Sequence, residues 1–262
     1  MKIYYKTLKG KRKTNQDSHT IFNNIDGSDK NKNDIILLGC YDGHGEEIKG
    51  KGDSISKFLS NNIPLIYGNK KNKYPFSNSF HYAVFDALKK KCLENKESYQ
   101  SGSTCVLAII YKINEILMLE VINLGDSRCI IINNDKTFEQ ITEDHNPSNL
   151  KEKKRIEKMG GVIIKDEFGT DRINGLSVSR GMGDFEITYI SSKPDIFRKK
   201  INKNMNSLII HCDGLVESMD NKAITNFIFK NKNTKKNIAS LLCKKAYTEG
   251  SEDNISVILL KF

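Results

Sequence analysis

Apolar residues along the chain gather in short runs of strand length, separated by polar loops. The most continuous run covers 35–41 and reads IILLGCY. A run of this length without alternation is typical of a strand buried on both faces. Comparable runs predict further strands at 1–8, 18–22, 106–111, 116–123, 129–133, 138–141, 207–211 and 255–260, and shorter strands that begin at 162 and 194.

A second pattern, apolar residues three or four positions apart, predicts helices between some of these strands. It extends over 53–62, with Pro64 just beyond the expected helix end, and over 78–92, where Ser77 or Asn78 can act as the N-cap. Further helices are predicted at 151–159, 221–229 and 234–248. Helices inserted between strands in this way favour a fold in which helices pack on a sheet.

The composition indicates in which cellular compartment the protein is expected. Hydrophobic residues make up 38% and charged residues 28% of the 262 positions, and no apolar run approaches the 18 or so residues of a membrane helix. The first residues are basic but contain no long apolar segment, so a secretory signal is not expected. Six widely spaced cysteines without a CxxC pair indicate buried thiols in a reducing compartment. We therefore expect a cytoplasmic or nuclear protein that does not enter a membrane.

The formal net charge of +10 at pH 7 favours anionic partners. The lysines are spread over several loops, however, and the chain has neither a recognised nucleic-acid-binding motif nor basic residues interleaved with aromatic ones. A solvated basic surface accounts for this charge better than nucleic-acid binding does. We expect no specific nucleic-acid partner.

Three predicted strand ends carry an aspartate. Asp42 ends the most apolar run and begins the sequence Asp-Gly-His-Gly, which places His44 beside it; Asp213 follows another strand, and Asp253 precedes the last one. A single Asp-Gly junction of this kind is most simply a turn. Three carboxylates at strand ends, by contrast, suit a site for hard divalent cations such as Mg²⁺ or Mn²⁺, provided that the fold brings them together.

The ordered set of motifs strongly resembles the metal-dependent serine/threonine protein phosphatases of the type 2C family. Each motif alone is weak, but the order is specific and the set spans nearly the whole chain. The matching segments are Arg12 with Asn15-Gln16-Asp17, Asp42-Gly43-His44-Gly45, Gly102-Ser103-Thr104, Gly125-Asp126-Ser127-Arg128, Asp144-His145-Asn146-Pro147, Arg155-Ile156 with Gly160-Gly161, Ser179-Arg180 with Gly183-Asp184, Asp213-Gly214 and Asp253-Asn254.

This resemblance implies an α+β fold, a four-layer α-β-β-α sandwich of two mainly antiparallel sheets flanked by helices. It also implies hydrolysis of phosphoserine and phosphothreonine in proteins with two Mg²⁺ or Mn²⁺ ions and without a phosphoenzyme. By the same resemblance Asp42 bridges both ions, and the carbonyl of Gly43 binds one of them. Asp213 and Asp253 bind the other, while Asp17 orients water from outside the metal's own ligands.

Arg12 and His44 complete the implied catalytic set. The planar guanidinium of Arg12 suits phosphate oxygens, and His44 is the candidate general acid for the leaving serine or threonine oxygen. Asp126 lies in a tight turn that by itself requires no ligand. The resemblance suggests instead that Asp126 binds a weaker third metal together with Asp213.

Several positions depart from the family pattern. Gln16 stands where many members have a glutamate, which predicts weaker binding of the second metal. Glu46 and Glu47 add negative charge near the site, and Glu217 replaces an aspartate that often completes the third-metal site. Because Arg12 and the core aspartates are present, an active enzyme is favoured over a pseudophosphatase that would bind phosphoproteins with the same fold.

The candidate site residues run from 12 to 253, so a single site requires 1–262 to form one domain. The charged segment 145–175 corresponds to the family's flap beside the active site, and His145 is expected to anchor its base. Thr104 is predicted to be a buried strand hydroxyl. His19, His81 and His211 are predicted to be structural. Phosphoproteins are the expected partners, and the chain is expected to be a monomer.

Overall fold

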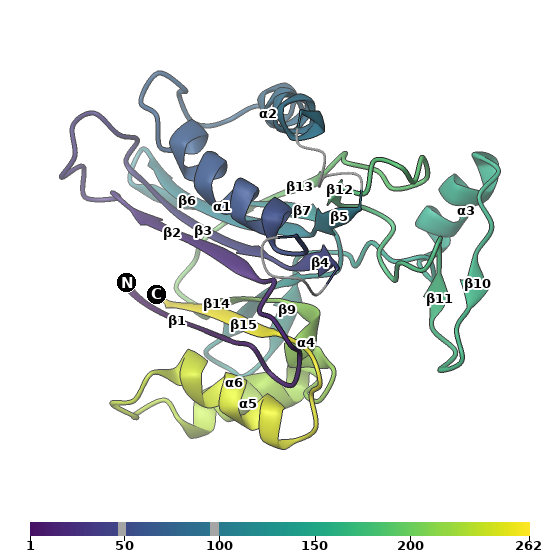
Figure 1. The fold of residues 1–262 in the computed structure, drawn as a ribbon. Coiled ribbons are helices and arrows are strands. Elements are labelled where there is room, and N and C mark those ends of the chain that lie inside the picture. The colour runs from purple at the N-terminus through teal and green to yellow at the C-terminus, as the bar shows by residue number, and fades with distance from the viewer. Residues whose placement is uncertain (47–50, 95–99) are drawn as a thin grey trace.

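The computed structural model describes residues 1–46, 51–94 and 100–262. Within these residues, two five-stranded antiparallel sheets lie between two pairs of helices (Figure 1). The first sheet has the strand order β13-β7-β6-β3-β2, which comprises Asp195–Lys200, Ile116–Leu124, Cys105–Ile113, Ile35–Tyr41 and Ser18–Asn23. The second has the order β1-β15-β14-β8-β9, which comprises Lys2–Leu8, Ile255–Lys261, Met205–His211, Arg128–Asn133 and Phe138–Gln140.

The helices form the two outer layers of the sandwich. Helices α1 (Ser54–Tyr67) and α2 (Asn78–Leu93) cover the first sheet, and α5 (Asn221–Lys230) and α6 (Ile238–Thr248) cover the second. The predicted four-layer α-β-β-α sandwich is confirmed. The described residues also form two shorter helices, α3 and α4, at Leu150–Lys158 and Asp213–Val216. No helix of the described ranges is long and apolar enough to cross a membrane.

Burial on both faces explains why the sequence of strand β3 is apolar throughout. Leu38 and Cys40 belong to the core between the sheets, whereas Ile35, Leu37 and Tyr41 pack against α1 and α2. Successive side chains of a strand point to opposite faces, so a strand covered on both sides needs apolar residues at every position. Burying one such aliphatic side chain contributes about 1.5–3 kcal/mol. The strand end that carries Asp42 is therefore held from both sides.

Helix α1 is longer than predicted. It continues through Pro64 to Tyr67, whereas the sequence pattern placed its end near residue 62. Proline removes the hydrogen bond to the carbonyl four residues earlier, here that of Ser60. The hydroxyl of Thr20 on β2 donates to this carbonyl instead, at 3.3 Å. Because Ile63 and Tyr67 are fully buried, the extra turn adds to the core.

Two other elements begin later than predicted, by four residues and by two. The helix expected from 234 begins at Ile238, because the side chain of Asn237 caps it by accepting a hydrogen bond from the backbone N–H of Ser240 at 3.1 Å. The strand expected from 162 is only the two-residue β10, Ile164–Lys165. It pairs with β11 (Asp171–Arg172) at the end of an excursion that also contains α3 and extends away from the sandwich (Figure 1).

A three-stranded sheet that the sequence did not predict lies at one end of the first large sheet (Figure 1). It has the order β12-β5-β4 and comprises Met182–Gly183, Ser101–Ser103 and Gly43–Gly45. Strands of two or three residues are too short to show a periodic pattern. This small sheet pairs His44 with Gly102, and Gly102 with Gly183 on its other side.

Candidate metal centre

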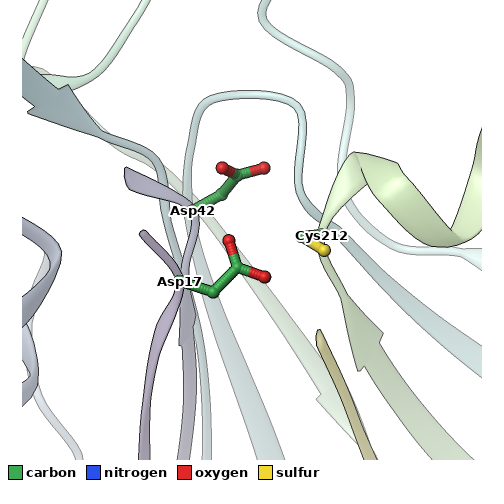
Figure 2. A group of neighbouring side chains, drawn as sticks. All are labelled: Asp17, Asp42 and Cys212. Atoms are coloured by element: carbon green, nitrogen blue, oxygen red, sulfur yellow. The ribbon is translucent and has the colours of Figure 1, made fainter. Parts of the chain in front are cut away.

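Five aspartates from distant parts of the chain converge where the two large sheets end. Asp42 follows β3, and the negative charges of the other four aspartates act on its carboxylate. Possible ligand atoms of Asp17, Asp42 and Cys212 all lie within 4.8 Å of one another. Figure 2 shows the two carboxylates side by side, with Cys212 across from them. The remaining aspartates come from the start of α4, the loop before β15 and the β7–β8 turn, and are Asp213, Asp253 and Asp126.

The burial and mutual repulsion of these carboxylates favour the binding of a cation. Burial and the neighbouring negative charges, first that of Asp213, hold the pKa of Asp42 well above its usual range. Burial likewise raises the pKa of Asp17, Asp126 and Asp213. Among the described residues, Asp17 Oδ1 and Asp213 Oδ1 are buried and accept no hydrogen bond. Oxygen donors that are buried, mutually repelling and partly unsatisfied fit a hard divalent cation.

Thr104 fixes the position of Asp42. Its hydroxyl accepts from the backbone N–H of Asp42 at 3.1 Å, and its own N–H donates to the Asp42 carbonyl at 2.9 Å. The same hydroxyl lies 2.8 Å from Ser127 Oγ, beside Asp126. Thr104 is buried, as predicted, but it lies between β5 and β6 and not within a strand, and it links two of the acidic positions. This second role leaves no signal in the sequence, because the pairing spans separate segments.

Glycine is the only residue type that fits at position 43, directly after Asp42. A Cβ at this position would lie 2.4 Å from the carbonyl oxygen of Gln16 and 2.9 Å from Ser56 Oγ. The backbone of β4 therefore runs closely beside the loop that precedes β2.

Two of the departures from the family pattern, Gln16 and Glu46, contact each other: the side-chain amide of Gln16 donates to the carbonyl of Glu46 at 3.2 Å. Glu47, the other acidic departure from the family pattern, lies outside the described residues.

Cys212 lines the cluster but is poorly suited to ligate a metal. Its thiol donates to the carbonyl of Asn254 at 3.3 Å and accepts from the N–H of Ser256 at 3.1 Å. Burial, followed by the charges of Asp17 and Asp42, raises the pKa of this thiol well above its usual range. A protonated sulfur is also a poor ligand for hard cations. Cys212 therefore packs beside the aspartates as a structural residue, as the sequence predicted for the cysteines, all of which are buried.

Hydrogen bonds from neighbouring residues hold Asp17 and the loop that carries Asp253. Ser256 on β15 donates to Asp17 Oδ2 at 2.6 Å. Glu217 Oε2 accepts from Ser251 Oγ at 3.0 Å and from the N–H of Glu252 at 2.9 Å, so it organises the loop that carries Asp253. Glu217, which replaces an aspartate that often completes the family's third-metal site, thus holds the loop through this oxygen.

The β7–β8 turn ties Asp126 to the base of the excursion. The N–H of Gly125 donates to His145 Nδ1 at 3.1 Å, and His145 Nε2 lies 3.1 Å from Asp195 Oδ2. Arg128, two residues beyond Asp126, binds Asp144 through Nε and Nη2, with the shortest contact at 2.7 Å. His145 thus lies at the base of the excursion, as predicted, and in addition contacts the turn that carries a candidate metal ligand.

Arg12 and His44, the other two implied catalytic residues, each contact an aspartate. Arg12 is exposed on the loop between β1 and β2, and its Nη2 donates to Asp253 Oδ2 at 2.7 Å. His44 Nε2 lies 2.6 Å from Asp184 Oδ2. Asp184 had no predicted role, although it belongs to one of the matching motifs. His81 and His211 are fully buried, the first against Glu120 and the second against the Cys212 carbonyl.

Comparison with known proteins identifies the family. The family model described as "Protein phosphatase 2C" matches residues 2–255. The chain belongs to the protein phosphatase 2C family. Probable protein phosphatase 2C member 13, mitochondrial, of Oryza sativa subsp. japonica is 29% identical over 270 residues, which cover 100% of this chain and 68% of that protein. Probable protein phosphatase 2C 2 of Arabidopsis thaliana is 32% identical over 270 residues, covering 97% and 65%.

The fold points to the same family. The crystal structure of a bacterial serine phosphatase superimposes with a TM-score of 0.73 at 25% identity, covering 99% of this chain and 96% of that one. The chain spans about two thirds of the length of the two plant relatives. The resemblance seen in the sequence is thereby confirmed, and so is the predicted class, a protein serine/threonine phosphatase of the 2C type. The family is metal-dependent, and the acidic cluster is a possible metal-binding group.

Proposed function

We propose that this chain hydrolyses phosphoserine and phosphothreonine in proteins with two Mg²⁺ or Mn²⁺ ions held by the acidic cluster. The observation that carries the proposal is the convergence of the cluster's carboxylates, with the buried oxygens Asp17 Oδ1 and Asp213 Oδ1 unsatisfied among the described residues. Removing one carboxylate from such a cluster is expected to abolish turnover, whereas a protein that only bound phosphoproteins would not need the cluster intact.

The residues divide between two cation positions. Asp42 would contact both cations, with the carbonyl of Gly43 on one and Asp213 and Asp253 on the other. Asp126 would join Asp213 at a weaker third position. When bound, the cations would supply a water of lowered pKa as the nucleophile and neutralise charge on the phosphate.

The chain's own groups would handle substrate and protons. Arg12 would bind phosphate oxygens through its planar fork of donors. Asp17, anchored by Ser256, would accept a hydrogen bond from the attacking water and orient it. As the water oxygen bonds to phosphorus and the ester P–O bond breaks, His44 would donate a proton to the leaving serine or threonine oxygen. Burial raises the pKa of the Cys212 thiol, which supports water and not this cysteine as the nucleophile.

We infer that residues 1–262 act as one domain, since residues from Arg12 to Asp253 contribute to one site. The excursion at 145–175 would serve as a flap that contacts the substrate protein. Phosphoproteins are the proposed partners of a monomer. The basic residues lie on separate loops, so neither a specific nucleic acid nor a membrane is proposed as a partner. The buried thiols favour a reducing compartment, cytoplasm or nucleus.

Phosphate release from a phosphothreonine peptide tests the proposal. The wild type, Asp42→Ala and Asp213→Ala would be assayed with Mn²⁺, with Mg²⁺ and with EDTA. Asp86→Ala, which alters an exposed aspartate on α2, is the matched control. We expect turnover that requires a divalent cation, is abolished in both site variants and is retained in the control. A folded wild type that binds cations but releases no phosphate from several phosphopeptides would instead indicate a pseudophosphatase.

A further inference from the structure

Asp184 holds the proposed general acid by a short contact. His44 Nε2 and Asp184 Oδ2 are 2.6 Å apart, and the two side chains are only 24% and 6% exposed. A carboxylate oxygen accepts hydrogen bonds, so Nε2 carries the proton of this contact. Nδ1 is then the nitrogen through which His44 can transfer a proton elsewhere.

The small three-stranded sheet is built around this pair. Gly102 on β5 pairs with His44 on one side and with Gly183, the residue before Asp184, on the other. A Cβ at Gly102 would lie 2.0 Å from Asp184 Oδ2 and 2.5 Å from His44 Nε2. Any side chain at this position would therefore occupy the space in which the imidazole and the carboxylate meet.

The backbone of Asp184 is constrained to present its side chain to His44. Its φ of +52° lies in the left-handed region, which residues other than glycine adopt infrequently. The N–H of Asp184 donates to the Ser101 carbonyl at 3.0 Å, and its carbonyl accepts from the N–H of Ile187 at 2.8 Å. A left-handed conformation held by hydrogen bonds on both sides fixes the direction of the carboxylate.

We propose that Asp184 is the positioning residue of the general acid: it fixes the ring orientation and tautomer of His44, so that Nδ1 delivers the proton to the leaving oxygen. The inference rests on the phosphatase activity proposed for this site. A carboxylate that holds a histidine by one nitrogen lets the other nitrogen act on substrate, a division of labour found in hydrolytic triads. Asp184 itself does not touch the reacting atoms.

Leaving-group dependence separates this role from a purely structural one. The alkoxide released from phosphothreonine is a strong base and needs a proton as it departs, whereas the nitrophenolate released from p-nitrophenyl phosphate is a weak base and does not. Both substrates would be assayed with Mn²⁺ for the wild type, Asp184→Asn, His44→Gln and the double variant. Glu186→Gln, an exposed acid two residues further along the same loop, is the matched control.

We expect Asp184→Asn to lower kcat on the phosphothreonine peptide about tenfold to a hundredfold, with little change in KM or in the rate on p-nitrophenyl phosphate. The double variant should be no slower than His44→Gln alone, because both changes remove one function. Equal losses on both substrates, or multiplicative losses in the double variant, would show that Asp184 only supports the fold.

Nitrogen-15 NMR of the metal-free protein gives a second readout that needs no activity. In the wild type His44 should carry its proton on Nε2, and Asp184→Asn should change the tautomer or broaden the signal. A wild-type His44 that carries a proton on Nδ1 but none on Nε2 would overturn the inference and leave the phosphatase proposal intact. Failure of the wild type to hydrolyse either substrate would overturn the proposed function, and with it the general-acid role.

Discussion

Arg12 donates a hydrogen bond from Nη2 to Asp253 Oδ2 at 2.7 Å across 241 positions of the sequence. The first loop of the chain and the loop before the last strand thus meet at the acidic cluster. This contact depends on β1 and β15, which pair along their full lengths from Lys2 with Lys261 to Leu8 with Ile255. The pairing of β1 with β15 therefore places the guanidinium that we propose to bind phosphate beside a candidate metal ligand.

Replacing Arg12 should weaken substrate binding more than it weakens the fold. Its side chain is 48% exposed, so Arg12→Ala should change the free energy of unfolding by less than about 1 kcal/mol. Loss of a charge-assisted contact to phosphate should raise KM for a phosphopeptide about tenfold to a hundredfold. Arg12→Lys should recover only part of this loss, because lysine lacks the planar fork. An unchanged KM in both variants would exclude Arg12 from phosphate binding.

His145 should be needed for stability at the base of the excursion. It is 2% exposed, and its removal would leave the Gly125 N–H and Asp195 Oδ2 without this partner. His145→Ala should therefore cost about 2–4 kcal/mol in urea unfolding. Combining it with Asp195→Ala should cost less than the sum of the two single changes, since both break the same contact. Additive losses would show that the two residues act independently.

Glu152 should make the excursion sensitive to acid. Burial alone would raise its pKa, but Arg180 and then Arg155 lower it from 4.5 to about 2. Nε and Nη2 of Arg180 donate to Oε1 at 3.0 and 2.6 Å, and Nη2 of Arg155 donates to Oε2 at 2.9 Å. The unfolded chain binds this proton more readily, so the stabilisation is complete above about pH 4.5 and is lost as pH falls towards 2.

A comparison of the wild type with Glu152→Gln isolates this effect from other titrating groups. The wild type should be more stable at pH 6 by an ionic contribution on the order of 3 kcal/mol, and the difference should shrink steadily below about pH 4.5. Urea unfolding at several pH values measures it. A stability difference that stays constant from pH 6 to pH 3 would contradict the assignment of a charged, ion-paired Glu152.

Local patterns predicted most of the sandwich because its strands and helices bury continuous apolar faces. The strand that ends at Asp42 is recognisable from its seven residues alone, since it is covered on both faces. Asp42, Asp213 and Asp253 were predicted for a related reason, because each follows or precedes an apolar strand, whereas the roles of Asp17 and Asp126 came from the family resemblance.

The remainder depends on contacts between distant segments. The extension of α1 through Pro64 relies on the hydroxyl of Thr20, which lies on strand β2, about 40 positions earlier in the sequence. The pairing of His44 with Asp184 spans 140 positions and is framed by strands of two and three residues, which carry no periodic pattern. Tertiary hydrogen bonds of this kind leave no local pattern in the sequence.

Titration of the metal-free protein with Mn²⁺ in a calorimeter tests most directly whether the aspartates form one cation site. The wild type, Asp42→Asn and the exposed-residue control Asp86→Asn would be compared at neutral pH. The convergence of buried, repelling carboxylates predicts saturable binding to the wild type and the control, and loss of that binding in Asp42→Asn. Mn²⁺ binding that is unchanged in Asp42→Asn would contradict the proposed metal centre.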